Sequence, residues 1–261
     1  MRGPPRDGGS LDAFARPLRE DPATLELVVA EAGERGGGLA AASGARGDVV
    51  LLVGVGVLAG RGLAGGHARR HRDRDGLVVV GYSPIRVLHE RAPADYAPRL
   101  RAAQYEAVCA RYEREPDTVL AELWGGTVSM RREDCAALGE AVERFHEQES
   151  GLRLGAACRE AGLRGVFDRS LRAERVYEPT LAEFVRESRA AGAHAAAVGR
   201  PPEAVGTTAP LLSAALQAVV LAAGSAHVWS VQDFAALRLD RLERRRGAIQ
   251  AVRRSAAPRR Y

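Results

Sequence analysis

The chain has 261 residues, of which 46% are hydrophobic and 27% charged, so it can fold as a globular protein with a sizeable core. Every one of the 38 basic residues is arginine, and the formal net charge of +5 bears on solubility and non-specific contacts, not on fold. The three cysteines lack Cys-x-x-Cys spacing, which argues against a disulfide framework or a zinc site. Residues 1–9 contain no apolar stretch typical of a signal peptide, and we therefore expect a cytoplasmic protein.

The most regular element is the apolar run at residues 49–57, which predicts a buried strand of a mostly parallel sheet. Gly54 and Gly56 interrupt this run, and glycines inside a strand usually mark a bulge or a close approach of another backbone. Predicted strands and helices alternate along the chain, which indicates an α/β fold. Further strands are expected at residues 24–30, 76–82, 123–132, 165–168 and 171–177, and helices near 10–18, 62–71, 98–112, 133–139, 152–161 and 180–191.

Two histidines, His67 and His71, lie four residues apart in the helix predicted at 62–71. A pair at this spacing can hold a metal ion, but no acidic residue lies between them and arginines surround them. We therefore favour a solvated helix face over a metal site.

The C-terminal part of the chain combines an uncharged stretch with a basic helix. Residues 205–232 carry no formal charge, and this stretch is long enough to span a membrane. Polar residues dilute the stretch and Pro210 suits a helix start, so we favour a buried or interfacial helix hairpin. The basic amphipathic helix expected at 233–254 suits solvent or a membrane surface, because it lacks the interleaved aromatics that specific nucleic-acid binding would use.

A series of motifs in the middle of the chain resembles glycosyltransferase family 2, whose members have the GT-A fold. The motifs are Gly-Gly-Thr-Val-Ser-Met-Arg-Arg at 125–132, Glu-Arg-Phe at 143–145, Gly-Leu-Arg-Leu at 151–154 and Ala-Gly-Leu-Arg-Gly-Val-Phe-Asp at 161–168. The resemblance covers roughly residues 5–190. It implies a GT-A-like (Rossmann-like), mostly parallel sheet flanked by helices in a domain at 1–192, followed by a helical region at 193–261. The first strand of the family is truncated or absent, since only residues 1–5 are available for it.

The resemblance implies transfer of a sugar from a nucleoside-diphosphate sugar to an acceptor hydroxyl, with inversion. That chemistry uses a carboxylate base, a cation such as Mn or Mg on the diphosphate, and nucleotide binding at the carboxyl ends of strands. The Asp-x-Asp metal motif of the family is matched here by Gly54 and Gly56, which have no carboxylates. Arg175 takes the position of a histidine that commonly completes the metal site. We therefore expect no metal cofactor.

The catalytic base implied by the resemblance is Glu147, by an ungapped count back from Gly151, with Glu149 as the following acid. With a one-residue deletion the base would be missing and Glu147 would be its neighbour. Capping of a helix N-terminus explains both carboxylates equally well.

Other site residues follow from the same resemblance. Glu31 would contact the nucleotide, and Trp124, Gly125 and Gly126 would form the floor of the acceptor pocket. Plain core packing is the competing interpretation of Trp124. The charge of the leaving group would be met by arginines in place of a metal, with Arg61, Arg131 and Arg175 as candidates.

Two functional hypotheses remain from the sequence. The first is a family 2 glycosyltransferase whose transfer is impaired or metal-independent, with a nucleotide-sugar and an acceptor as ligands. The second is a non-catalytic pseudo-glycosyltransferase that acts as an interaction partner or scaffold of another protein. For the first hypothesis, the C-terminal helices are candidates for contact with the inner face of the membrane.

Overall fold

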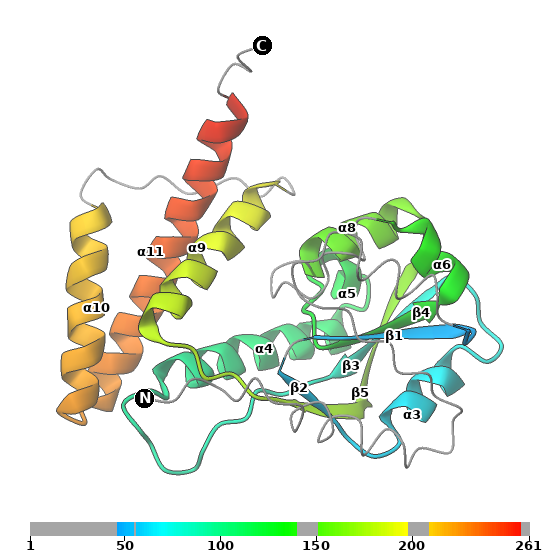
Figure 1. The fold of residues 1–261 in the computed structure, drawn as a ribbon, viewed down its shortest axis with the longest axis horizontal. Coiled ribbons are helices and arrows are strands. Elements are labelled where there is room, and N and C mark those ends of the chain that lie inside the picture. The colour runs from blue at the N-terminus through cyan, green and yellow to red at the C-terminus, as the bar shows by residue number, and fades with distance from the viewer. Residues whose placement is uncertain (1–45, 55, 140–150, 198–208, 257–261) are drawn as a thin grey trace. The chain divides into compact units, whose positions relative to one another are not determined.

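The structure of the protein is a computed structural model that describes residues 46–54, 56–139, 151–197 and 209–256 (Figure 1). The strand predicted at 24–30 and the helix predicted at 10–18 lie outside these ranges. The chain divides into two compact units. One, the sheet unit, contains the described residues up to Pro84 together with Ala107–Val176, and the other, the helical unit, contains Ile85–Glu106 and the described residues from Tyr177 onward.

The sheet unit is built on a five-stranded sheet in the order β1-β4-β3-β5-β2. Its strands are β1 (Val49–Val53), β2 (Val57–Ala59), β3 (Leu77–Tyr82), β4 (Thr127–Arg131) and β5 (Arg164–Arg175). Only the pair β3–β5 is parallel, and the pairs β1–β4, β3–β4 and β2–β5 are antiparallel. The fold is therefore α/β as predicted, but the prediction of a mostly parallel sheet is wrong, because the sheet is mixed.

The apolar runs in the sequence did not indicate the direction of the strands. All of β3 is buried, and so are Thr127–Met130 in β4, because helices cover both faces of the sheet. Burial on both faces produces an apolar run in either direction of the strand, so such a run does not distinguish parallel from antiparallel neighbours. The strands predicted at 165–168 and 171–177 are a single strand, β5.

The run at 49–57 is not one strand but two, β1 and β2, which lie at opposite ends of the strand order. Four spacings between neighbouring strands amount to about 19 Å. The four residue steps from Val53 to Val57 reach at most about 14 Å. The sheet must therefore curl until its two edges approach each other, and it is nearly closed like a barrel. Gly54 and Gly56 lie in the connection that completes this curl.

Helices cover the two faces of the sheet with separate clusters of core residues. α5 (Thr118–Ala121), α6 (Arg132–Ala137) and α8 (Gly151–Glu160) pack on one face, where the buried residues include Val128, Met130 and Leu154. α3 (Leu63–Arg70) packs on the other face against Val79 and Leu171. The helices predicted at 62–71, 133–139 and 152–161 are confirmed, within a few residues at each end.

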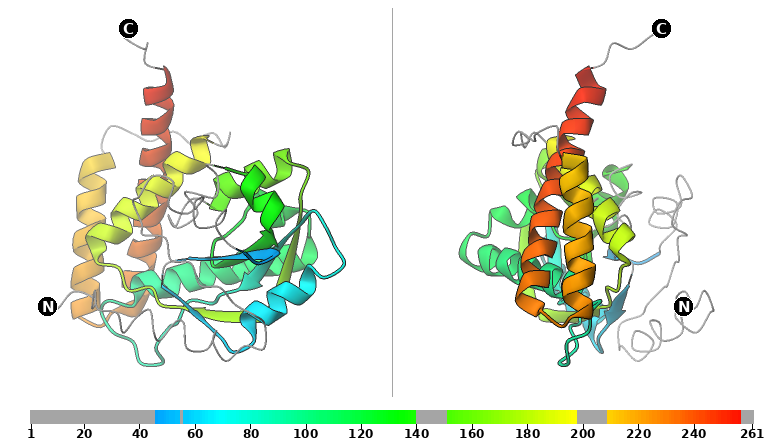
Figure 2. Two further views of the ribbon diagram at one scale, coloured as in Figure 1. Left: turned by 45° about the vertical axis from the view of Figure 1, so that its right-hand side comes forward. Right: turned by 90° about the vertical axis from the view of Figure 1, so that its left-hand side faces the viewer.

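The helical unit consists of α9 (Leu181–Ala197), α10 (Ala209–Ser225), α11 (Trp229–Ala256) and the first part of α4 (Tyr96–Arg114). The views in Figure 2 agree that α10 and α11 lie side by side as a hairpin. Phe184, Val220 and Leu239 are fully buried in the core of this unit. Thr180 and Glu183 form a capping box at the start of α9, with the Thr180 amide donating to the Glu183 carboxylate at 2.8 Å. The predicted domain boundary between 192 and 193 falls inside α9.

Within the residues that the structure describes, none of the helices combines the length and the apolar character that crossing a membrane would require.

Candidate functional site

The carboxyl ends of three strands lie at one side of the sheet, which we call the carboxyl edge. β1, β3 and β5 run in one direction, because β1 and β3 are both antiparallel to β4 and β3 is parallel to β5. Their carboxyl ends therefore meet beside the start of β4, at Gly126. In α/β folds ligands are commonly bound outside the carboxyl ends of parallel strands, in open sheets and in closed barrels alike, which makes this edge the first place to look for a binding site.

The backbone hydrogen bonds at this edge join residues that are far apart in the sequence. The Gly54 amide donates to the Gly126 carbonyl at 2.8 Å and so extends the β1–β4 ladder. The Val176 amide donates to the Gly56 carbonyl, also at 2.8 Å, which extends the pairing of β5. The two glycines thus link one edge strand of the sheet to the other, and this is the close approach of backbones that their presence predicted.

The two glycines differ in how much side chain they could carry. Gly56 has φ of 75°, and a Cβ atom there would lie 2.7 Å from the Val176 carbonyl oxygen. Gly54 has ordinary space, with the nearest atom 3.5 Å from a Cβ. A Cβ atom would therefore fit at position 54, whereas any side chain would strain the backbone at position 56.

The side chain of Arg175 lies at the same edge. Arg175 ends β5, is 6% exposed, and its Nη1 donates to the Gly125 carbonyl oxygen at 3.3 Å. Its backbone amide donates to the carbonyl of Pro84, just beyond β3. The structure thus brings together Gly54, Gly56, Gly125, Gly126 and Arg175, five of the residues singled out in the sequence. Such an edge offers one buried guanidinium and several main-chain groups to an anionic ligand.

Trp124 begins this segment and is half-buried, with its backbone amide donating to the Tyr112 hydroxyl at 3.0 Å. That hydroxyl in turn donates to the Glu122 carbonyl oxygen at 2.7 Å. The loop before β4 is therefore fastened to the core of the sheet unit through Tyr112, whose ring also contacts Phe167.

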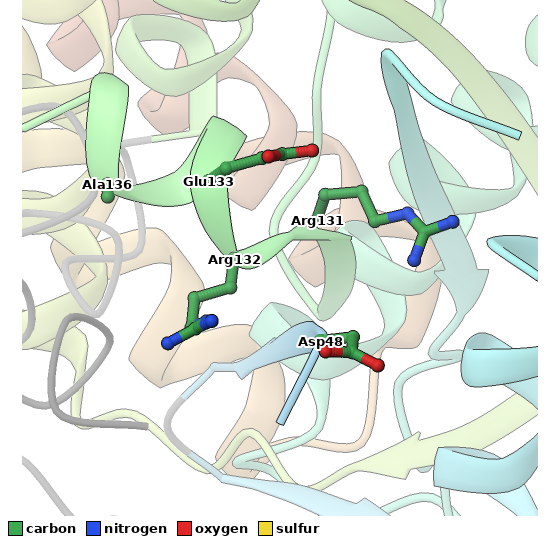
Figure 3. A pocket seen from close by; sticks show the side chains of 5 residues that line it. All are labelled: Asp48, Arg131, Arg132, Glu133 and Ala136. Carbon is green, nitrogen blue, oxygen red and sulfur yellow. The ribbon is translucent and has the colours of Figure 1, made fainter. Parts of the chain in front are cut away.

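Arg131 lies elsewhere. It closes the other end of β4, where it pairs with Val49 at the start of β1, so a whole strand separates it from Gly126. Its Nη2 donates to the His71 carbonyl oxygen at 2.6 Å. A small cavity of about 290 Å³ is lined there by Asp48, Arg131, Arg132, Glu133 and Ala136. Figure 3 shows the side chains of Arg131 and Arg132 diverging, so the two guanidinium groups do not converge on one ligand.

Four further predicted residues are Glu31, Glu147, Glu149 and Arg61. Glu31, Glu147 and Glu149 lie outside the described residues. Arg61 is exposed just before α3. In the described part of the chain, no three or more His, Cys, Asp or Glu residues gather in a way that could hold a metal ion.

The predicted environment of His67 and His71 is wrong. His67 lies in α3 and His71 directly follows it, and both are fully buried instead of forming a solvated helix face. The Ser129 hydroxyl of β4 lies 2.8 Å from His67 Nδ1 and 2.9 Å from His71 Nε2. One imidazole N–H donates to this oxygen, and the hydroxyl donates to the other imidazole. The small residues Ala64–Gly66 before His67 were the available signal, because they let the helix approach the sheet closely.

Burial keeps both imidazoles neutral. It lowers the pKa of His67 to about 3, with a smaller contribution from His71 and an opposing one from Asp168. Burial also lowers the pKa of His71, helped by the charge of Arg131. Without solvent access, these groups serve packing rather than ligand binding.

No family model, no curated protein and no solved structure matches this chain.

Proposed function

We propose that this chain is a family 2 glycosyltransferase-like protein that binds a nucleoside-diphosphate sugar at the carboxyl ends of β1, β3 and β5. Transfer to an acceptor hydroxyl, with inversion, would be impaired or metal-independent. The observation that carries the proposal is the position of Arg175, which lies beside Gly54, Gly125 and Gly126 although up to 121 positions separate these residues in the sequence. The motifs at 125–132 and 161–168 support the same assignment.

The charge balance of this edge suits a diphosphate without a cation. A guanidinium offers planar, bidentate donors that match phosphate oxygens, and it keeps its charge at all physiological pH values. Arg175 would therefore meet the charge of the leaving group that a divalent metal meets in the family. Glu147 remains the proposed base and Glu31 the proposed nucleotide contact.

Gly56 favours the second hypothesis, a non-catalytic protein that partners or scaffolds another one. Its φ of 75° and the nearby Val176 carbonyl leave no unstrained position for the second carboxylate of a metal motif. A chain that has lost metal-dependent transfer can keep the fold as an interaction module. We place either form in the cytoplasm, at the inner face of the membrane.

Calorimetry with UDP-sugars and GDP-sugars, with and without manganese, tests the proposal. We expect binding of one of these ligands and no enhancement by manganese. Arg175→Ala should weaken this binding by about 10-fold or more, because it removes charge-assisted hydrogen bonds worth about 1.5–3 kcal/mol. Arg131→Ala is the matched control, since this arginine also donates to a backbone carbonyl but lies at the other end of β4.

The possible results separate the hypotheses. Thermal denaturation of each variant shows whether a loss of binding reflects unfolding. Equal losses in the two variants, or a lack of nucleotide-sugar binding by the folded wild-type chain, would refute Arg175 as the diphosphate contact. Binding without transfer to any acceptor supports the non-catalytic form. Strong enhancement by manganese would show that the metal motif was matched to the wrong residues.

A further inference from the structure

The outward side of α10 is apolar along the whole helix. The 17 residues of α10 include no charged side chain. Leu211 is 76% exposed and Leu221 57% exposed, with Leu212 and Val219 also exposed. These four residues spread over about half of the helix circumference around Leu211, and we call them the α10 outer face. Single exposed leucines are common in proteins, but an uncharged helix that exposes several of them marks a contact surface.

The opposite side of α10 accounts for its place in the fold. Val220, Ala223 and Gly224 are buried, and the carbonyl of Val220 accepts a hydrogen bond at 3.2 Å from Gln232 of α11. The helix is therefore held on its inner side by the core of the helical unit. The residues of the α10 outer face are not among those of that core, and Val231 and Phe234 at the start of α11 are also exposed.

The neighbouring helix α11 adds positive charge. Arg238, Arg241 and Arg245 follow Val231 and Phe234 at spacings of three and four residues, so these residues share one exposed stripe of α11. The guanidinium of Arg238 lies 5.0 Å from the centre of the Phe234 ring.

The acidic residues of α11 do not offset this charge at the surface. Asp240 and Glu243 are buried and form ion pairs with arginines. Asp233 is exposed but pairs with Arg91 at 2.6 Å. The exposed surface of the α10–α11 hairpin is therefore aliphatic on α10 and basic on α11.

We propose that the α10 outer face lies in the headgroup region of an anionic lipid bilayer, with Arg238, Arg241 and Arg245 contacting the lipid phosphates. An aliphatic helix face with flanking arginines is the combination by which helices bind such interfaces without crossing them. A second copy of this chain is a poorer occupant, because it would bring its own arginines toward these arginines. A nucleic acid would need stacking partners that four aliphatic side chains do not provide. The proposal does not depend on sugar transfer.

Vesicle co-sedimentation of the full chain tests this surface. We expect binding to phosphatidylcholine vesicles that contain phosphatidylglycerol, and much weaker binding to phosphatidylcholine alone. The double variant Leu211→Glu/Leu221→Glu should bind at least about 10-fold more weakly, because it places charge at the apolar contact. Leu88→Glu is the matched control, since Leu88 belongs to the same unit, is 56% exposed and lies outside α10.

The salt dependence of vesicle binding separates the contribution of the arginines from that of the apolar residues. Each arginine near an anionic surface strengthens binding about five-fold, so Arg238→Gln/Arg241→Gln/Arg245→Gln should weaken it by about 100-fold at low salt. Raising the salt concentration should weaken wild-type binding strongly and the triple variant only slightly.

Three results would overturn the proposal. They are no binding of the wild type to anionic vesicles at low salt, an equal loss of binding in the Leu88 control, and a wild-type dimer that becomes monomeric in the α10 double variant. The last result would assign the α10 outer face to a second copy of the chain.

Discussion

Each of the two units buries a serine hydroxyl at the centre of a polar cluster, but the partners differ. In the sheet unit, Ser129 lies between the neutral imidazoles of His67 and His71. In the helical unit, Ser188 accepts a hydrogen bond from Arg101 at 3.0 Å and donates one to Asp240 at 2.7 Å. The sheet unit thus buries neutral polar groups at this position, and the helical unit buries an ion pair.

The difference follows from how many donors surround each cluster. Asp240 is 1% exposed, yet it accepts hydrogen bonds from Ser188, Gln104 and Arg244 and pairs with Arg101 at 3.0 Å. A buried carboxylate is tolerated only when its oxygens are satisfied in this way. The histidines share one hydroxyl, and His67 Nε2 and His71 Nδ1 have no further hydrogen-bond partner among the described residues, which is too little to compensate charged rings. The two units should therefore respond differently to loss of a charge and to acid.

The largest effect is expected from Asp240→Asn. This change removes the negative charge and leaves Arg101, which is 7% exposed, as a buried cation without its main counter-charge. Breaking a buried pair in this way costs about 3–5 kcal/mol of the free energy of unfolding. Urea denaturation followed by the fluorescence of Trp229, which lies in the helical unit, measures the loss.

Asp233→Asn is the matched control for this variant. Asp233 also lies on α11 and pairs with an arginine at 2.6 Å, but its side chain is 46% exposed. Exposed pairs contribute at most about 1 kcal/mol. If both variants lose equal stability, burial does not set the strength of the Arg101–Asp240 pair.

Acid should lower the free energy of unfolding by a smaller amount, and mainly that of the sheet unit. Because the pKa of His67 falls from 6.5 to about 3 on folding, the unfolded chain binds a proton that the folded chain does not bind. Stability is therefore full above pH 6.5 and falls as the pH decreases toward 3, by about 2 kcal/mol at pH 5 for this residue. The fluorescence of Trp124, in the sheet unit, should show this loss in urea denaturation between pH 7.5 and 5.

The helical unit should lose its ion pair only at lower pH. Burial alone would raise the pKa of Asp240, but the charges of Arg101 and Arg244 hold it below its usual value of 3.8. The contribution of this pair is present above pH 3.8 and disappears as the pH falls through the lower value in the folded chain. Single-tryptophan variants distinguish the two responses. His67→Gln should flatten the pH dependence seen by Trp124; an unchanged slope would contradict the assignment.

The sequence predicted the elements with strong local signals and missed those that depend on distant contacts. The helix at α9 follows from its capping box of Thr180 and Glu183, and β3 follows from its run of valines. The direction of β4 and the break between β1 and β2 depend on pairing with strands far away in the sequence. The burial of His67 and His71 depends on Ser129, which lies on another element. Around Gly54, the order of the family-like motifs singled out Arg175 and Gly125, whereas hydrophobic periodicity alone did not.

The smallest expected effect is the difference in stability loss between alanine variants of Gly54 and Gly56, the two glycines that link the edge strands of the sheet. Gly56→Ala should cost about 1–2 kcal/mol, because alanine is disfavoured at a φ of 75° and its Cβ would lie 2.7 Å from the Val176 oxygen. Gly54→Ala should cost less than about 0.5 kcal/mol, since its Cβ would make only ordinary contacts. Thermal denaturation of both variants measures the difference. Equal losses would mean that position 54 is as constrained as position 56. A difference in the expected direction would show that backbone geometry requires glycine at position 56 and does not require it at position 54.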